Sequence, residues 1–168
     1  MYSVGSLLVY GRNGVCRVRE IATRPGNGEA PERLYYTLKP LYTTETIIIP
    51  VDTKVALRPV LTRGQAEELV RSIPSIETEA IRITSLPALS RYYQDAYQTS
   101  DCVELLRLIK SIHEKNRSAT DNGRKPGKLD ERYLRLAEDQ LYGELCVALD
   151  LEREEVPSYI REVLASAS

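Results

Sequence analysis

The side chains that could carry catalytic or metal chemistry are few and far apart in this chain of 168 residues. The one histidine, His113, lies among charged residues, and the three cysteines, Cys16, Cys102 and Cys146, are widely separated. A zinc site or an activated nucleophile needs partner side chains that converge, and no glycine-rich phosphate loop accompanies them. The sequence therefore predicts a non-enzymatic protein with no catalytic residue, metal, cofactor or small-molecule substrate, and with reduced thiols.

The strongest charge pattern is a basic cluster in the C-terminal half, although the whole chain has a net charge of −1. Between positions 107 and 128 there are seven basic and two acidic residues, whereas four basic and ten acidic residues follow. Lys and Arg bind backbone phosphates, so the cluster could contact nucleic acid. The candidate DNA-binding residues are Lys110, Lys115, Arg117, Arg124, Lys125, Lys128 and Arg132. An ordinary solvated basic surface is the alternative interpretation.

The first sixty residues show the pattern of short β-strands. Two β-favouring runs flank Gly11-Arg12-Asn13-Gly14, which is typical of a tight hairpin. Further β-type runs cover residues 34–39, 46–51 and 55–60, with turn residues between them. About five short strands in this length predict a small barrel of the SH3 or Tudor type.

The hydrophobic period changes from two to 3.6 at residues 61–62. Thr62 can cap a helix that Pro74 ends, and Asp101, with Glu104 three residues on, can cap another. Asp130 is expected to cap a third, after a loop over residues 118–128. The expected helices beyond the first are listed by range: 88–98, 101–117, 130–149 and 152–165.

The predicted fold class is thus α+β, with a small Tudor/SH3-like β-barrel followed by an all-α helical domain. We expect a barrel over residues 1–60, a connecting helix over 61–75 and a helical domain over 76–168. No apolar run approaches the length that spans a membrane, and the chain enters a strand pattern directly. We therefore expect a cytoplasmic protein without a membrane partner.

Five segments, in order along the chain, resemble the CarD-like family of bacterial transcription regulators, especially its clostridia-like members. They are residues 4–16, 35–40, 49–60, 100–105 and 130–145, and they include Tyr35-Tyr36-Thr37-Leu38-Lys39-Pro40. The resemblance implies a Tudor-like domain that docks on the β subunit of RNA polymerase. It also implies a helical domain that contacts promoter DNA at the upstream edge of the melted region and helps to hold the open complex.

The resemblance also points to individual residues. Arg24 stands where relatives carry a polymerase-contacting arginine, and Ile48 stands where some carry another arginine. The polymerase-binding residues that the resemblance implies are Arg24, Tyr36, Leu38, Ile48 and Pro50. From the residues alone, alternation requires one face of each strand to be barrel core, so some of these apolar side chains could be buried instead.

Many relatives place a Trp before the central helices as a wedge against a minor-groove base step. This chain has no Trp, and Ala80 is the nearest match to that position. Tyr92 or Tyr93 could replace it, or the grip on DNA is weaker, or the role of this protein has shifted. The alternative functions are a protein–protein adaptor whose helical domain binds another protein, and an RNA-binding barrel, which adjacent Tyr35 and Tyr36 on opposite strand faces disfavour.

Overall fold

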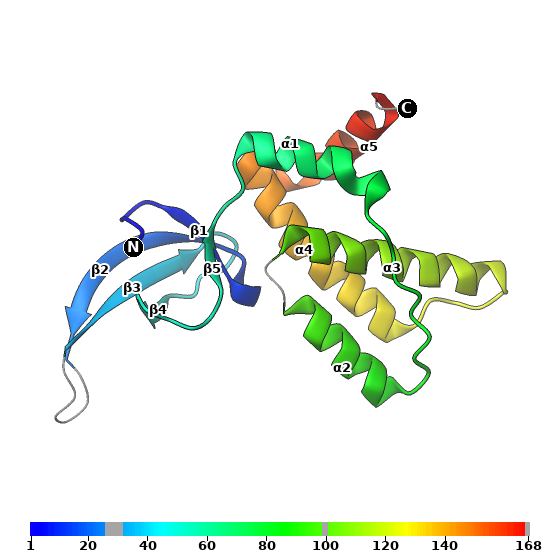
Figure 1. The fold of residues 1–168 in the computed structure, drawn as a ribbon, viewed down its shortest axis with the longest axis horizontal. Coiled ribbons are helices and arrows are strands. Elements are labelled where there is room, and N and C mark those ends of the chain that lie inside the picture. Colours follow the sequence, from blue (N-terminus) through cyan, green and yellow to red (C-terminus); the bar gives the residue numbers. More distant parts are fainter. Residues whose placement is uncertain (26–31, 99–100, 167–168) are drawn as a thin grey trace. The chain divides into compact units, whose positions relative to one another are not determined.

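The structure is a computed structural model that describes residues 1–25, 32–98 and 101–166. The chain forms two compact units, Met1–Val60 and Leu61–Ser168 (Figure 1). The first is a β-sheet unit and the second is helical, which confirms the predicted α+β fold class. Each unit has its own hydrophobic core.

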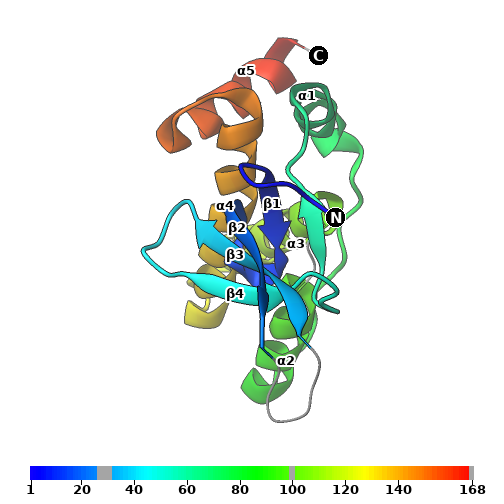
Figure 2. The ribbon, with the colours of Figure 1, turned by 90° about the vertical axis from the view of Figure 1, so that its left-hand side faces the viewer.

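The first unit is a five-stranded antiparallel sheet with the strand order β4-β3-β2-β1-β5 (Figure 2). The strands are β1 (Leu7–Tyr10), β2 (Val15–Arg24), β3 (Arg33–Pro40), β4 (Ile47–Pro50) and β5 (Leu57–Pro59). The predicted hairpin joins β1 to β2 through a 3₁₀ turn, Gly11–Asn13. Gly14 follows with a φ of 72°, a conformation that glycine adopts at little cost.

The main hydrophobic cluster of the sheet unit lies on one face of the sheet. Its buried members are Leu8, Cys16, Val18, Tyr36, Leu38 and Ile49. Within each strand these residues sit at alternate positions, as expected for one face of a sheet. Val9 and Val15, which pair across β1 and β2 on the other face, are buried as well. β3 shows the alternation clearly, because Tyr36, Leu38 and Pro40 are buried and the residues between them are not.

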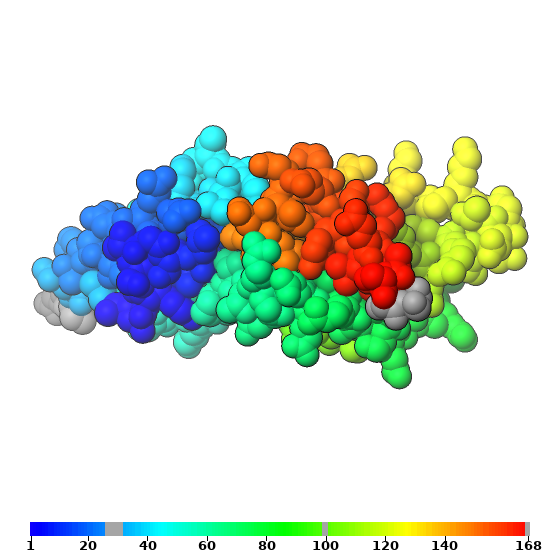
Figure 3. Space-filling view, turned by 90° about the horizontal axis from the view of Figure 1, so that it is seen from above, coloured from blue at the N-terminus to red at the C-terminus, as the bar shows by residue number. Residues whose placement is uncertain are grey.

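The helical unit begins at Leu61 and includes the segment expected to connect the domains. Its helices are α1 (Arg63–Ser72), α2 (Leu86–Tyr97), α3 (Cys102–Asp121), α4 (Lys128–Leu149) and α5 (Val156–Ser166), with 3₁₀ turns at Ile73–Ser75 and Arg153–Glu155. Figure 3 shows α1 and α5 side by side on its surface.

α1 is anchored to the rest of the helical unit at its start and along one face. Thr62 forms a capping box with Gln65, as the Thr62 side chain predicts. The backbone N–H of Leu61 donates to the buried carboxylate of Glu144 at 2.9 Å. Since Ala66 and Val70 lie in the helical core, residues 61–72 are part of this unit.

The boundaries of α3 and α4 differ from the expected ones. Asp101 caps α3 as predicted, but α3 continues to Asp121 and α4 begins at Lys128. The loop expected over residues 118–128 is therefore wrong in its first four positions and in its last one. Nothing between 118 and 121 breaks a helix, and α3 ends only where Asn122 and Gly123, with a φ of 75°, turn the chain.

Asp130 is not the N-cap of α4, which corrects the sequence-based expectation. The cap position is Gly127, and Asp130 lies one turn into the helix with an exposed fraction of 5%. One Asp130 oxygen accepts hydrogen bonds from the Tyr93 hydroxyl at 2.5 Å and from the Lys115 ammonium at 2.9 Å. This network joins α2, α3 and α4. The pKa of Tyr93 is raised well above its usual range, mainly by burial and secondly by the hydrogen bond to Asp130.

We expect Asp130→Ala to lower the free energy of unfolding by about 3 kcal/mol, because it leaves a partly buried Lys115 ammonium unpaired. Asp139→Ala is the matched control, since Asp139 also pairs with one cation, Arg153, but its side chain is 61% exposed. That control should lose less than about 1 kcal/mol. Urea denaturation followed by circular dichroism measures both, and equal losses would contradict a structural role for Asp130.

Candidate interaction surfaces

The sheet unit presents one face away from its core, which we call the outer face. The registers of β2, β3 and β4 align its members in rows across the three strands. None of these residues is buried. The outer face consists of Glu20, Ala22 and Arg24 from β2, Arg33, Tyr35 and Thr37 from β3, and Ile48 and Pro50 from β4, with Asp52 just beyond.

A β-bulge decides which side of the sheet Arg24 occupies. The register between β2 and β3 shifts between Val18 and Glu20, so Arg19 is the extra residue. Cys16 and Val18 point into the core before the bulge. Strict alternation would send every later even-numbered residue there as well, whereas the bulge turns them to the outer face. Arg24 is therefore exposed at the end of β2.

The structure brings together three of the five polymerase-binding candidates and separates the other two. Arg24, Ile48 and Pro50 lie on the outer face, where Ile48 is 44% exposed. Tyr36 and Leu38 point into the core with exposed fractions of 1% and 0%. These two side chains cannot contact a partner, which corrects their assignment.

Tyr35 is the outer-face aromatic that the sequence-based assignment missed. It pairs with Ala22 on one side and with Pro50 on the other, so it lies between two candidate strands. Its neighbour Tyr36 instead accepts a hydrogen bond from the backbone N–H of Tyr2 at 2.9 Å within the sheet unit. The alternation between adjacent residues was the available signal, because only one of two consecutive tyrosines can face outward.

Charge is concentrated at one end of the outer face. Arg24 lies directly opposite Arg33, an unfavourable pairing of like charges. Asp52 compensates one of them, because its carboxylate accepts from the Arg33 guanidinium at 2.9 Å. Among the described residues Arg24 has no ion pair, so this end carries a positive charge that an acidic partner could meet.

The two edges of the sheet differ in what they offer a partner strand. At the β5 edge, Pro59 has no N–H and its carbonyl accepts from the Arg58 guanidinium at 3.2 Å. The Leu57 carbonyl accepts from the Tyr2 hydroxyl at 3.4 Å. At the β4 edge, the backbone of the exposed Ile48 has no such hydrogen-bond partner among the described residues. Strand addition is therefore better supported at β4 than at β5.

On the helical unit, two of the candidate DNA-binding lysines are engaged in internal contacts. The Lys110 ammonium donates to the backbone carbonyls of Ile73 and Ile76 at 2.7 and 2.6 Å. Lys115 pairs with the buried Asp130. Both cations stabilise the helical unit and are poorly placed to bind phosphate. The other candidates have exposed side chains: Arg117, Arg124, Lys125, Lys128 and Arg132.

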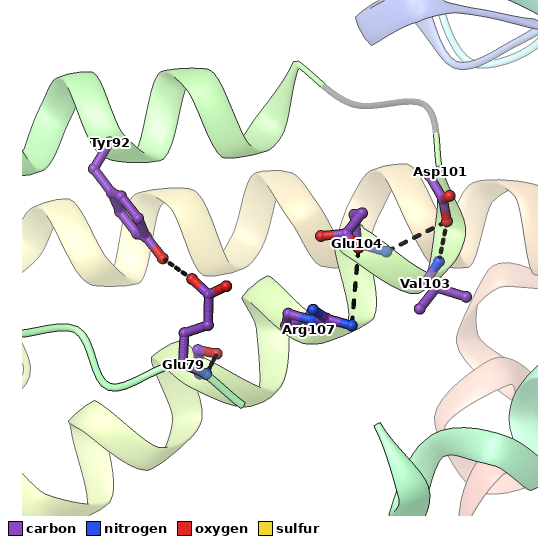
Figure 4. A network of polar contacts seen from close by, with 7 residues as sticks. Glu79, Tyr92, Asp101, Val103, Glu104 and Arg107 are labelled. Atoms are coloured by element: carbon purple, nitrogen blue, oxygen red, sulfur yellow. Dashed lines mark hydrogen bonds and ion pairs between the residues drawn. The ribbon is translucent and has the colours of Figure 1, made fainter. Parts of the chain in front are cut away.

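An extended segment, residues 76–85, crosses α3 and leads into α2; we call it the crossing segment. The buried Ser111 of α3 accepts the backbone N–H of Glu79 at 2.9 Å, and Thr78 donates to Glu114 at 2.6 Å. Figure 4 shows Tyr92 of α2 pointing at Glu79, whose carboxylate accepts from the Tyr92 hydroxyl at 3.1 Å. The segment is therefore held on α3 and α2 by polar contacts.

The crossing segment also decides which side chains are available near the expected wedge position. Ala80 lines a hollow of about 470 Å³ beside α3. Tyr93 is fully buried and so cannot insert into DNA. Tyr92 is partly exposed, and its hydroxyl would have to give up the hydrogen bond to Glu79 to do so. Leu86, the first residue of α2, is 67% exposed and was not singled out from the sequence.

The groups that could carry enzyme chemistry are dispersed in the structure. All three cysteines are buried, and burial raises the pKa of the Cys16 thiol to about 11. His113 contacts only Glu138, at 3.2 Å, among the hydrogen bonds of the described residues. Within residues 1–25, 32–98 and 101–166 no three potential metal ligands converge, and no helix there has the length and apolar character needed to cross a membrane.

The sheet unit matches a known family. Residues 2–61 match the family model of the CarD-like/TRCF RID domain, which confirms the predicted resemblance over the sheet unit. Domains of this family interact with the β subunit of RNA polymerase and are non-enzymatic interaction modules. No curated protein matches the chain.

Proposed function

We propose that this chain, a CarD-like protein by its RID domain, docks on the RNA polymerase β subunit and contacts promoter DNA through its helical unit. In this proposal it is a bacterial transcription regulator that modulates the stability of the open complex. The RID domain matches the whole sheet unit, so the polymerase contact is assigned to that unit. The DNA contact is assigned to the exposed basic residues of the helical unit.

The observation that carries the docking proposal is the exposed β4 edge beside the outer face. A partner strand gains affinity from backbone hydrogen bonds at such an edge and selectivity from the adjoining side chains. Ile48 supplies apolar surface, Tyr35 an aromatic ring, and Arg24 a cation without an ion pair in the described residues. Arginine and tyrosine are common anchors at protein interfaces.

Three features support the DNA contact. Arg117, Arg124, Lys125, Lys128 and Arg132 are exposed, so they can reach phosphates, and three of them fall in or beside the turn between α3 and α4. Arg82 of the crossing segment and Arg124 line the same hollow beside α3, which adds a basic residue from another element. Leu86 is an apolar side chain exposed at the start of α2, and Leu and Pro are among the residues that wedge base steps.

The docking proposal predicts that Arg24→Glu weakens binding of the full chain to a β-lobe fragment of RNA polymerase at least about tenfold, as expected for an interface anchor. Arg12→Glu is the matched control, because Arg12 is equally exposed but lies in the β1–β2 turn. Titration by calorimetry measures both affinities. Equal loss in the two variants would reveal a non-specific charge effect, and no binding by the unaltered chain would overturn the docking proposal.

The DNA proposal predicts a loss of salt-sensitive binding when Arg124, Lys125 and Lys128 are all replaced by Gln. The slope of log K against log salt concentration should fall by about 0.9 for each lost phosphate contact. Lys110→Gln should leave that slope unchanged and lower the melting temperature, because Lys110 binds two backbone carbonyls. A chain that binds the β fragment with no measurable affinity for promoter DNA would instead be a protein–protein adaptor.

The wedge assignment predicts that Leu86→Trp lengthens the lifetime of the open complex about two- to tenfold, which corresponds to about 0.4–1.4 kcal/mol. Leu86→Ala should shorten the lifetime. Val103→Trp is the control, since Val103 is also an exposed apolar residue of the helical unit but lies in the first turn of another helix, α3. Filter-binding decay after addition of a competitor gives the lifetimes, and a larger effect at Val103 than at Leu86 would refute the wedge.

A further inference from the structure

We propose that the polymerase strand pairs with this chain through a single residue of β4, Ile48, and that Pro50 ends the intermolecular ladder. This inference rests on the proposed docking function and specifies its register. It follows from the hydrogen-bond pattern at the β4 edge. Within β4, this pattern leaves only the backbone N–H and C=O of Ile48 available to a partner strand.

The first step is the direction of each peptide group in β4. The N–H of Val51 donates to the Leu34 carbonyl of β3 at 3.0 Å. In an antiparallel pair, bonded and non-bonded residue pairs alternate. The N–H and C=O groups of Ile47 and Ile49 therefore point toward β3, whereas those of Ile48 and the C=O of Pro50 point away from the sheet.

The second step is that Pro50 cannot pair with an added strand. Its ring removes the N–H donor that any other residue would present at this edge. Its carbonyl already accepts the backbone N–H of Thr53 at 3.1 Å, in the turn that follows β4. Position 50 therefore offers a partner neither a donor nor an open acceptor, and a ladder growing toward it must stop.

The third step is that Ile48 offers a partner strand both a backbone N–H donor and a C=O acceptor. Its backbone has no hydrogen-bond partner among the described residues, and its side chain is 44% exposed on the outer face. One residue whose N–H and C=O are both open forms one closed pair of hydrogen bonds with an opposing residue. The register of the docked strand is thus fixed at one point, and the adjoining side chain of Ile48 is the nearest one on the outer face.

The occupant we assign is a strand of the RNA polymerase β subunit, because the matched RID domain spans the whole edge and its family interacts with that subunit. Arg24 lies on the outer face two strands in from this edge and has no ion pair among the described residues. Its positive charge favours an acidic partner segment over a second copy of this chain, which would bring a second Arg24 toward the interface. Pairing of two copies through Ile48 is the competing outcome.

The test is residue-resolved amide exchange of the full chain, labelled for NMR, with and without the β-lobe fragment. In the free chain the Ile48 amide should exchange rapidly, while those of Ile47 and Ile49 are protected by β3. Binding should slow exchange at Ile48 at least about tenfold, as for an amide that enters a hydrogen bond. Binding with exchange at Ile48 unchanged overturns the register inference alone, whereas absence of binding overturns the docking function as well.

Pro50→Ala tests the ladder stop, because it restores an outward N–H at position 50. If Pro50 ends the ladder, the new amide becomes protected in the complex and dissociation slows about two- to tenfold, the worth of one net hydrogen bond. Pro59→Ala at the β5 edge is the matched control. It should change neither the dissociation rate nor the protection of amides in the complex. Unchanged dissociation with an unprotected Ala at position 50 contradicts the stop, and Ile48 protection that rises with chain concentration without the fragment assigns the edge to a second copy.

Discussion

The candidate interface of the sheet unit depends on one irregularity, the β-bulge between Val18 and Glu20. A side-chain period of two means that a single added residue exchanges the two faces of the strand beyond it. Because of this exchange, β2 contributes Val18 to the core before the bulge and Arg24 to the outer face after it. Without the bulge, the same sequence would direct the Arg24 guanidinium toward the core of the sheet unit, where an unpaired charge is costly.

The two edges of the sheet differ in which backbone groups remain available to a partner strand. Prolines remove an outward donor from each edge strand, at Pro50 in β4 and at Pro59 in β5. On the β5 side a tyrosine hydroxyl and an arginine also occupy the exposed carbonyls. Exposed edges are sites of unwanted pairing, so a β4 edge whose open backbone groups among the described residues belong to Ile48 combines the proposed docking with protection against uncontrolled association.

In the helical unit, polar contacts between elements place the groups that remain available. Lys110 of α3 binds the Ile76 carbonyl, Ser111 accepts the Glu79 N–H, and the Tyr92 hydroxyl donates to the Glu79 carboxylate. These contacts engage the Lys110 ammonium and the Tyr92 hydroxyl within the helical unit. They also set the course of the crossing segment toward α2, at whose first turn Leu86 is exposed.

The sequence alone determined the elements and the fold class, because their signals are local. Alternating β-branched runs, the glycine-flanked turn at residues 11–14 and the caps Thr62 and Asp101 act through neighbouring residues, and each is found where the pattern predicts it. The family resemblance over the sheet unit is likewise a property of the residue order, and the family match confirms it.

Only the tertiary structure decided which side chains are left for a partner. Asp130 has the composition and position of a helix cap, yet its oxygen is buried against Tyr93 and Lys115, residues 37 and 15 positions away in the chain. Tyr36 and Leu38 belong to a resembling segment but face the core, because pairing with β2 and β4 fixes the orientation of β3. Burial and long-range pairing are sums over contacts between distant segments, so no local pattern of residue types specifies them.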